Sequence, residues 1–134
     1  MRAELSNHII PSSHAHLPAV PNFIFETKGS AGPSIEASRR ACHNGAVGAR
    51  AMQSLRTYRR DEPVCDNNVY SISSIYYGGA LKKYGHSVAK PKGPETRQEY
   101  YMHPSQLGVW TMDVDTNSFM RGATAFKNAL ASWI

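Results

Sequence analysis

Between Ile35 and Tyr58, small and apolar residues recur at helical spacing, with no proline to interrupt the pattern. The recurring positions are Ile35, Cys42, Ala46, Ala49, Met52 and Leu55. Gly45 and Gly48 lie in the same stretch, although a glycine costs about 1 kcal/mol in an exposed helix interior. We therefore expect a long helix that packs closely on the layer beneath it and turns its polar residues outward. These polar residues are Glu36, Arg40, His43 and Arg50.

Segments typical of β-strands lie on both sides of this helix. The stretch from Phe23 to Lys28 is rich in aromatic and β-branched residues, and so is the stretch from Val69 to Tyr77. Gly78-Gly79 predicts a tight hairpin, because a two-residue hairpin turn needs positive φ angles. The return strand is expected from Ala80 to about Val88. Shorter strands are expected over Glu99–Met102 and Leu107–Met112.

A second helix is expected near the end of the sequence, beginning at Thr116. Asp113 and Asp115 resemble a paired-carboxylate metal motif, but we favour Asp115 as the helix N-cap, where an acid is stabilising. The apolar stripe of this helix is expected to lie in the core. Its members are Phe119, Ala123, Phe126, Leu130 and Trp133.

At 134 residues, the chain has room for one domain. The order of elements predicts an α/β (α+β) fold with a small mixed sheet flanked by helices, after an irregular lead-in over residues 1–20. The longest uncharged apolar stretch, Leu17 to Phe25, holds two prolines and is far shorter than the ~20 residues that a membrane helix needs. No signal-peptide pattern opens the chain, and Cys42 and Cys65 are expected to be free thiols. We therefore expect an intracellular protein of the cytoplasm or nucleus, with no membrane association.

The net charge of +5 is concentrated in the first part of the chain. Residues 1–60 hold eight Lys or Arg and three Glu, whereas residues 61–134 hold seven charges of each sign. A basic face of this kind is typical of binding to a nucleic-acid backbone, and a solvated helix face is the alternative. The candidate nucleic-acid-binding residues are Lys28, Arg39, Arg40 and Arg50.

Glu26 and Lys28 are the candidate catalytic residues, because positions i and i+2 of a strand project from the same face. The carboxylate of Glu26 and the backbone carbonyl of Thr27 offer the oxygen ligands that Mg²⁺ or Mn²⁺ prefers. The Lys28 ammonium can polarise an attacking water or stabilise the charge that develops on phosphorus. An ordinary surface Glu–Lys pair is the alternative.

The run from Pro21 to Gly29 resembles the E-x-K strand of the PD-(D/E)XK, or restriction-endonuclease-like, nuclease superfamily. More narrowly, the chain resembles a group of uncharacterised fungal proteins that carry such a domain. The likeness extends through Ala41–Arg50, Tyr70–Gly79 and Phe119–Ala129. It implies a partial restriction-endonuclease-like domain over residues 21–134. It also implies metal-dependent endonuclease or exonuclease activity on nucleic acid, DNA rather than RNA, with low sequence specificity.

The superfamily site contains two acids and a lysine. Glu26 matches the second metal-binding acid and Lys28 matches the lysine, whereas the first acid has no match, since residues 1–25 hold only Glu4. We therefore expect an N-terminally truncated or degenerate member with an incomplete sheet, whose exposed edge favours self-association. Two hypotheses follow. The chain is either a Mg²⁺-dependent nuclease domain, or a non-catalytic remnant that binds nucleic acid or an acidic partner through its arginine-rich helix.

Overall fold

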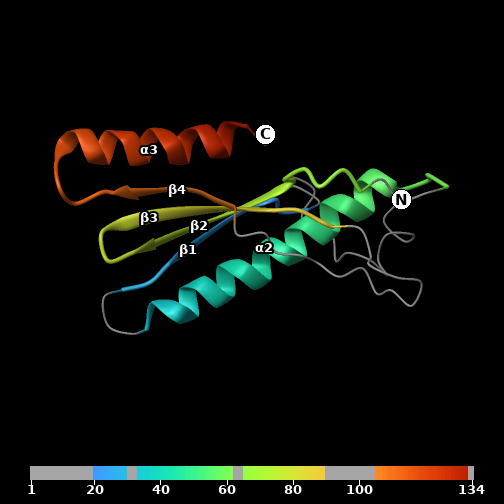
Figure 1. Cartoon of the computed structure of the whole chain (residues 1–134), viewed down its shortest axis with the longest axis horizontal. Coiled ribbons are helices and arrows are strands. Elements are labelled where there is room, and N and C mark those ends of the chain that lie inside the picture. Colours follow the sequence, from blue (N-terminus) through green and yellow to red (C-terminus); the bar gives the residue numbers. More distant parts are fainter. Residues whose placement is uncertain (1–19, 30–32, 62–64, 90–104, 133–134) are drawn as a thin grey trace.

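The computed structural model of the chain describes residues 20–29, 33–61, 65–89 and 105–132. Their elements follow in the order strand, helix, three strands and helix (Figure 1). They are β1 (Phe23–Thr27), α2 (Ser34–Thr57), β2 (Ser71–Tyr77), β3 (Ala80–His86), β4 (Ser105–Thr111) and α3 (Thr116–Ala131). This order confirms the expected mixed α/β fold, in which a small sheet is flanked by helices.

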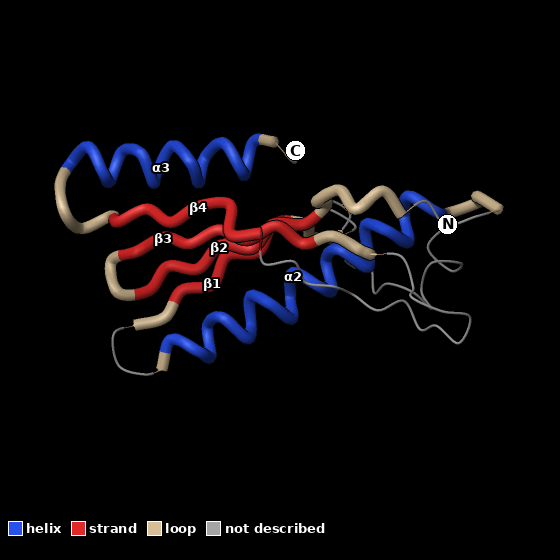
Figure 2. The backbone as a smooth tube through the Cα atoms, viewed as in Figure 1, coloured by secondary structure: helices blue, strands red, loops and turns tan. Residues whose placement is uncertain are grey.

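The four strands form one mixed sheet in the order β1-β2-β3-β4 (Figure 2). β1 pairs with β2 in parallel, whereas β2 pairs with β3, and β3 with β4, in antiparallel fashion. Parallel strands need a crossover connection, and α2 lies in the connection between β1 and β2. Gly78 and Gly79 join β2 to β3 with φ angles of 55° and 74°, which confirms the predicted hairpin turn.

Several local predictions can be compared with the structure. Asp115 caps α3, because its carboxylate accepts a hydrogen bond from the Ser118 N–H at 2.7 Å. Cys42 and Cys65 are free thiols, as expected. The strand expected over Glu99–Met102 lies outside the described residues, and so does the lead-in apart from Val20.

The sheet is the middle of three layers, with α2 on one face and α3 on the other (Figure 1). The alternation of side chains along β1 shows both contacts. Glu26 accepts a hydrogen bond from Asn44 of α2. Phe23 and Phe25 pack edge-on against Phe126 of α3, with ring centroids 5.4 and 5.0 Å away. The surfaces outside α2 and outside α3 are therefore separated by the full thickness of the sheet.

α2 packs closely on the sheet because small residues line its buried side. The buried positions are Ala37, Ala41, Gly45, Gly48, Ala49, Ala51 and Gln53. A Cβ atom at Gly45 would clash with the ring of His86, and one at Gly48 would lie 2.6 Å from the Ser71 hydroxyl oxygen. The glycines therefore permit the close approach that the sequence predicted. Ile35 was wrongly placed in the buried stripe: it is 56% exposed, because it lies one turn before the exposed Arg39.

Polar side chains are buried within β2 and β3. Ser71, Ser73 and Ser74 have no exposed surface, and His86 is 2% exposed. His86 Nε2 lies 2.7 Å from the Ser73 hydroxyl oxygen, whereas His86 Nδ1 has no hydrogen-bond partner among the described residues. Burial lowers the pKa of His86, because a charged imidazole loses its hydration in this position.

The last turns of α2 extend beyond the sheet (Figure 1) and are held by the segment that precedes β2. Arg56 Nη2 donates to Asp66 at 2.9 Å, and the guanidinium lies 3.8 Å from the centre of the Tyr70 ring. The Tyr70 hydroxyl also donates to Asp66, at 2.6 Å, and this bond holds the pKa of that carboxyl well below its usual range. Gln53 Nε2 contacts Cys65 Sγ at 3.7 Å. Met52, Leu55 and Tyr58 also pack on a small apolar cluster formed by Val20 and Ala51. The end of α2 is therefore held by this segment and by this cluster.

The apolar stripe of α3 is less buried than predicted. Phe119 and Leu130 are 49% and 43% exposed, and the buried positions of α3 are Gly122 and Ala129. A Cβ atom at Gly122 would clash with the sulfur of Met112. The helix rests on its smallest residues and on Phe126, which packs against β1, whereas Phe119 and Leu130 flank the contact.

Substitution of Gly45 tests the close approach of α2. Gly45→Ala should lower the free energy of unfolding, because the new methyl group meets the His86 ring and overpacking costs about 1–3 kcal/mol. This loss should outweigh the gain in helix propensity from alanine, which is about 1 kcal/mol. Urea unfolding followed by circular dichroism measures the difference. Gly29→Ala is the matched control, since no atom lies within 4 Å of the place that its methyl group would take. Unchanged or higher stability of Gly45→Ala would contradict the packing.

Acid should destabilise the fold through His86. The pKa of His86 in the fold lies below its unfolded value of about 6.5. As the pH falls below that value, the unfolded chain binds a proton that the folded chain does not, so stability present at pH 7 is lost toward pH 5. Urea unfolding at pH 7, 6 and 5 measures this slope. His86→Gln should flatten it, whereas His43→Gln, at an exposed position of α2, should leave it unchanged. A slope that is the same in His86→Gln and wild type would exclude this role.

Candidate nucleic-acid interface

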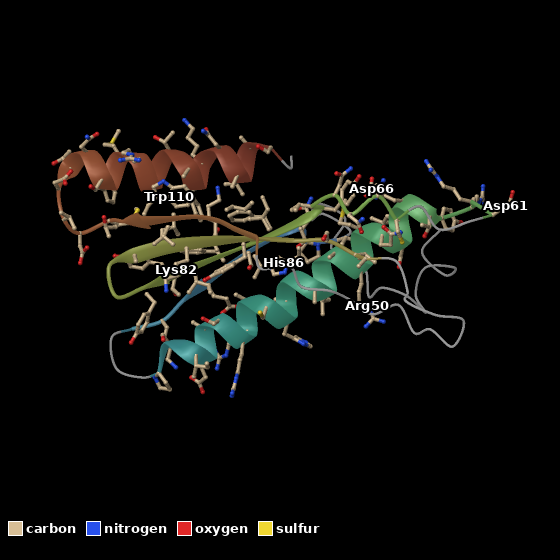
Figure 3. All side chains as sticks on the ribbon, in the orientation of Figure 1. Arg50, Asp61, Asp66, Lys82, His86 and Trp110 are labelled. Carbon is tan, nitrogen blue, oxygen red and sulfur yellow. The ribbon has the colours of Figure 1, made fainter. Side chains whose placement is uncertain are left out.

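Three of the predicted phosphate-binding residues lie together on the outer side of α2. Arg39, Arg40 and Arg50 are all exposed, and Figure 3 shows Arg50 pointing away from the sheet. Arg39 and Arg50 are eleven residues apart, which is about three turns and about 17 Å along the axis, so they lie on one side of the helix. Arg40 lies about 100° around the helix from Arg39 and is also exposed. These three residues form a single surface, termed the α2 basic surface.

Arg39 and Arg40 form no close contact with a carboxylate among the described residues. Glu36, one turn earlier, is paired with Lys28. The hydrogen bond and charge of Lys28 lower the pKa of Glu36, and the charges of Arg40 and Arg39 add to this effect. The positive potential of the surface therefore remains available to an anion.

Lys28 directly follows β1 and turns toward the first turn of α2. Its Nζ donates a hydrogen bond to the Glu36 carboxylate, and the two side chains are 20% and 56% exposed. The Lys28 N–H donates to the Tyr76 carbonyl at 3.3 Å and so continues the pairing of β1 with β2. An exposed ion pair contributes little to stability, so it orients Lys28 without preventing a phosphate from replacing Glu36.

Glu26 lies on the α2 side of β1, as the alternation of the strand predicts. Its Oε1 accepts a hydrogen bond from Asn44 Nδ2 at 2.8 Å. Glu26 and Lys28 do not pair with each other. Their partners, Asn44 and Glu36, are eight residues apart on α2, which is about 12 Å along the helix axis. The structure therefore places both residues on one side of β1 but directs their head groups to different positions.

The donors expected for Mg²⁺ are the Glu26 carboxylate and the Thr27 carbonyl. In a parallel pair, only every second residue of a strand bonds its backbone groups to the neighbouring strand. The Lys28 N–H and the Asn22 carbonyl bond to β2. The backbone groups of Thr27, which alternates with these residues, therefore point away from β2. That carbonyl is outside the ladder, but one oxygen of Glu26 is already bonded to Asn44. No group of three or more His, Cys, Asp or Glu able to hold a metal occurs among the described residues. One carboxylate and one carbonyl are too few for a protein-built magnesium site, so these donors do not fit the ion by themselves.

Asn44 and Glu36, the partners of Glu26 and Lys28, were not identified from the sequence. Both contacts arise because α2 crosses over the same face of β1 that carries the two side chains. A signal was present in the sequence, since a strand followed by a crossover helix brings polar residues of the helix over the strand. The exact positions depend on how α2 is rotated on the sheet.

No known protein family, curated protein or solved structure matches the chain. Neither α2 nor α3 is long and apolar enough to cross a membrane. A functional assignment therefore depends on the geometry and charge of the surfaces described above.

Proposed function

We propose that the domain binds the phosphate backbone of nucleic acid at the α2 basic surface and does not cleave it. The observation that carries this proposal is the exposure of three arginines on the outer part of one helix, two of them without a carboxylate partner among the described residues. Guanidinium groups donate several hydrogen bonds in a geometry that suits phosphate oxygens. The surface is thus suited to an anionic backbone.

The length of the α2 basic surface suits a nucleic-acid duplex. A duplex carries one phosphate charge per ~1.7 Å of axis, so it presents about ten phosphates over the ~17 Å between positions 39 and 50. Contacts with phosphates position a protein on the duplex without reading its sequence. DNA binding of low specificity is the expected behaviour.

The positions of Glu26 and Lys28 support binding without catalysis. The two head groups bind different residues of α2, and the described residues supply no second carboxylate beside Glu26. Metal-dependent phosphodiester cleavage needs a bound cation to stabilise the charge on phosphorus. The residues that would hold one do not form a complete set here.

Duplex DNA binding should weaken with salt in proportion to the number of arginine contacts. Three contacts predict that log K falls with log salt with a slope of about −3, at ~0.9 for each contact. Arg56 is excluded from this count because it is paired with Asp66. Arg39→Gln with Arg40→Gln should reduce the slope to about −1 and weaken binding by about 50-fold at 0.1 M salt. Fluorescence anisotropy of a labelled duplex at several salt concentrations gives both quantities.

The matched control removes two charges elsewhere on the domain. Lys82 and Lys127 are exposed and lie outside the α2 basic surface, so Lys82→Gln with Lys127→Gln should change the slope much less. Equal losses from the two double variants would show that net charge alone drives binding. An affinity that does not vary with salt would exclude backbone binding altogether.

We retain a metal-dependent nuclease of the PD-(D/E)XK type as a second candidate, for one reason. Glu26 and Lys28 share the α2 side of β1, and the Thr27 carbonyl beside them is outside the β1–β2 ladder, which is the arrangement that the resemblance implies. Substrate phosphates and water would have to complete the coordination of Mg²⁺ or Mn²⁺.

Cleavage assays separate the two candidates. Labelled DNA and RNA are incubated with the wild-type chain and Mg²⁺ or Mn²⁺, and we expect no metal-dependent cleavage. Cleavage that is abolished by both Glu26→Ala and Lys28→Ala would establish the nuclease instead. Cleavage that neither substitution changes would come from a contaminant or another site.

A further inference from the structure

On the side of the sheet opposite α2, a hollow of about 370 Å³ lies between β4 and α3. It is lined by Trp110, Met120, Arg121, Thr124, Ala125 and Asn128. A smaller hollow of about 80 Å³ shares Trp110 and Arg121 with it. Neither hollow has an acidic residue among its described lining residues. The site therefore combines an aromatic ring and a cation with neutral hydrogen-bonding side chains.

Trp110 packs against the backbone of β4 because Gly108 has no side chain. The six-membered ring of Trp110 occupies the space in which a Cβ atom of residue 108 would lie. Figure 3 shows Trp110 between β4 and α3, where part of the side chain borders the hollow. An indole ring fixed in this way offers a rigid apolar surface on which a planar ring can stack.

Lys83 places a buried positive charge beside the hollow. It is 8% exposed, and its Nζ donates to the Ala125 carbonyl at 2.8 Å and lies 5.3 Å from the centre of the Trp110 ring. No carboxylate of the described residues forms an ion pair with it. Burial accordingly lowers the pKa of Lys83. A buried cation without a counter-ion is unfavourable, so the hollow favours an anionic ligand.

Arg121 supplies a second positive charge at the boundary of the two hollows. It is exposed, and it forms no ion pair with any residue that the structure describes. The nearby carboxylate of Asp115 is bonded to the N–H and hydroxyl of Ser118 as the cap of α3. Thr124 and Asn128 add a hydroxyl and an amide, which can both donate and accept hydrogen bonds.

We propose that this hollow binds an aromatic base that carries a phosphate, as one unpaired nucleotide of a single strand. The base stacks on Trp110, and the phosphate pairs with Arg121 and is attracted by Lys83. A free nucleotide offers the same chemistry and is separated from a strand by the experiment below. The site lies across the sheet from the α2 basic surface and does not depend on duplex binding there.

The fluorescence of Trp110 can report binding at the hollow. Trp110 and Trp133 are the two tryptophans of the chain, so Trp133→Phe leaves Trp110 as its sole indole. In this background, a 12-residue oligothymidylate should quench the indole fluorescence saturably, because a base stacks on the ring. A 12-residue abasic strand has the same phosphates without bases and should quench little. Thymidine monophosphate that quenches at the same concentration as the oligonucleotide would identify a free nucleotide as the occupant.

Substitutions then test each contact by anisotropy of the labelled oligothymidylate. In an otherwise wild-type chain, Trp110→Leu should weaken binding about 5- to 100-fold, the loss expected for one stacked base. Arg121→Gln should weaken binding and lower the salt slope by about 0.7, while Lys127→Gln, also exposed on α3, serves as the matched control. Because Arg121 is exposed, its variant remains informative even where Trp110→Leu disturbs folding.

The outcomes distinguish this site from the α2 basic surface. The double variant Arg39→Gln with Arg40→Gln should retain the quenching of Trp110, whether or not duplex binding is lost. Equal binding of the abasic strand and the oligothymidylate, together with no effect of Arg121→Gln beyond that of Lys127→Gln, would overturn the proposal. Loss of quenching in the Arg39 and Arg40 double variant would also overturn it, since the strand would then bind on the other face.

Discussion

The contact between Gly45 of α2 and the ring of His86 fixes how the long helix lies across the sheet. The helix approaches so closely that Ser71 and Ser73 lie fully buried beneath it. The same contact sets the rotation of α2 about its axis. It therefore turns Arg39 outward, and the packing of one side of the helix determines the chemistry of the other.

The rotation of α2 also accounts for the partners of the E-x-K residues. Glu26 and Lys28 project toward α2, and each meets a polar side chain of the helix, Asn44 or Glu36. Both contacts involve side-chain head groups only. The backbone of Thr27, between the two residues, lies outside the β1–β2 ladder. The helix thus supplies hydrogen-bond partners to two polar side chains in and next to an edge strand.

Much of the fold could be predicted because local patterns decide it. Helical spacing over residues 35–58 predicted α2, and Gly78-Gly79 predicted the hairpin. The alternation along β1 placed Glu26 and Lys28 on one side. Burial along α3 was not predictable in the same way, because Gly122 seats against Met112 and leaves Phe119 exposed. Contacts of that kind depend on how two layers meet, which no single segment encodes. Membership of the nuclease superfamily stays a prediction.

The length of α2 gives its two ends different stabilities. A helix of 24 residues is about 36 Å long, whereas the seven residues of β2 extend over only about 23 Å. The overhanging turns are held by the polar contacts of Arg56 with Asp66 and Tyr70, and by a small apolar cluster in which Met52, Leu55 and Tyr58 pack on Val20 and Ala51. Most of these side chains are only partly buried, and contacts of that kind open more readily than a fully buried core. The overhang is therefore a unit able to unfold locally while the rest of α2 remains folded, so backbone amides near Thr57 exchange with solvent before those near Gly45.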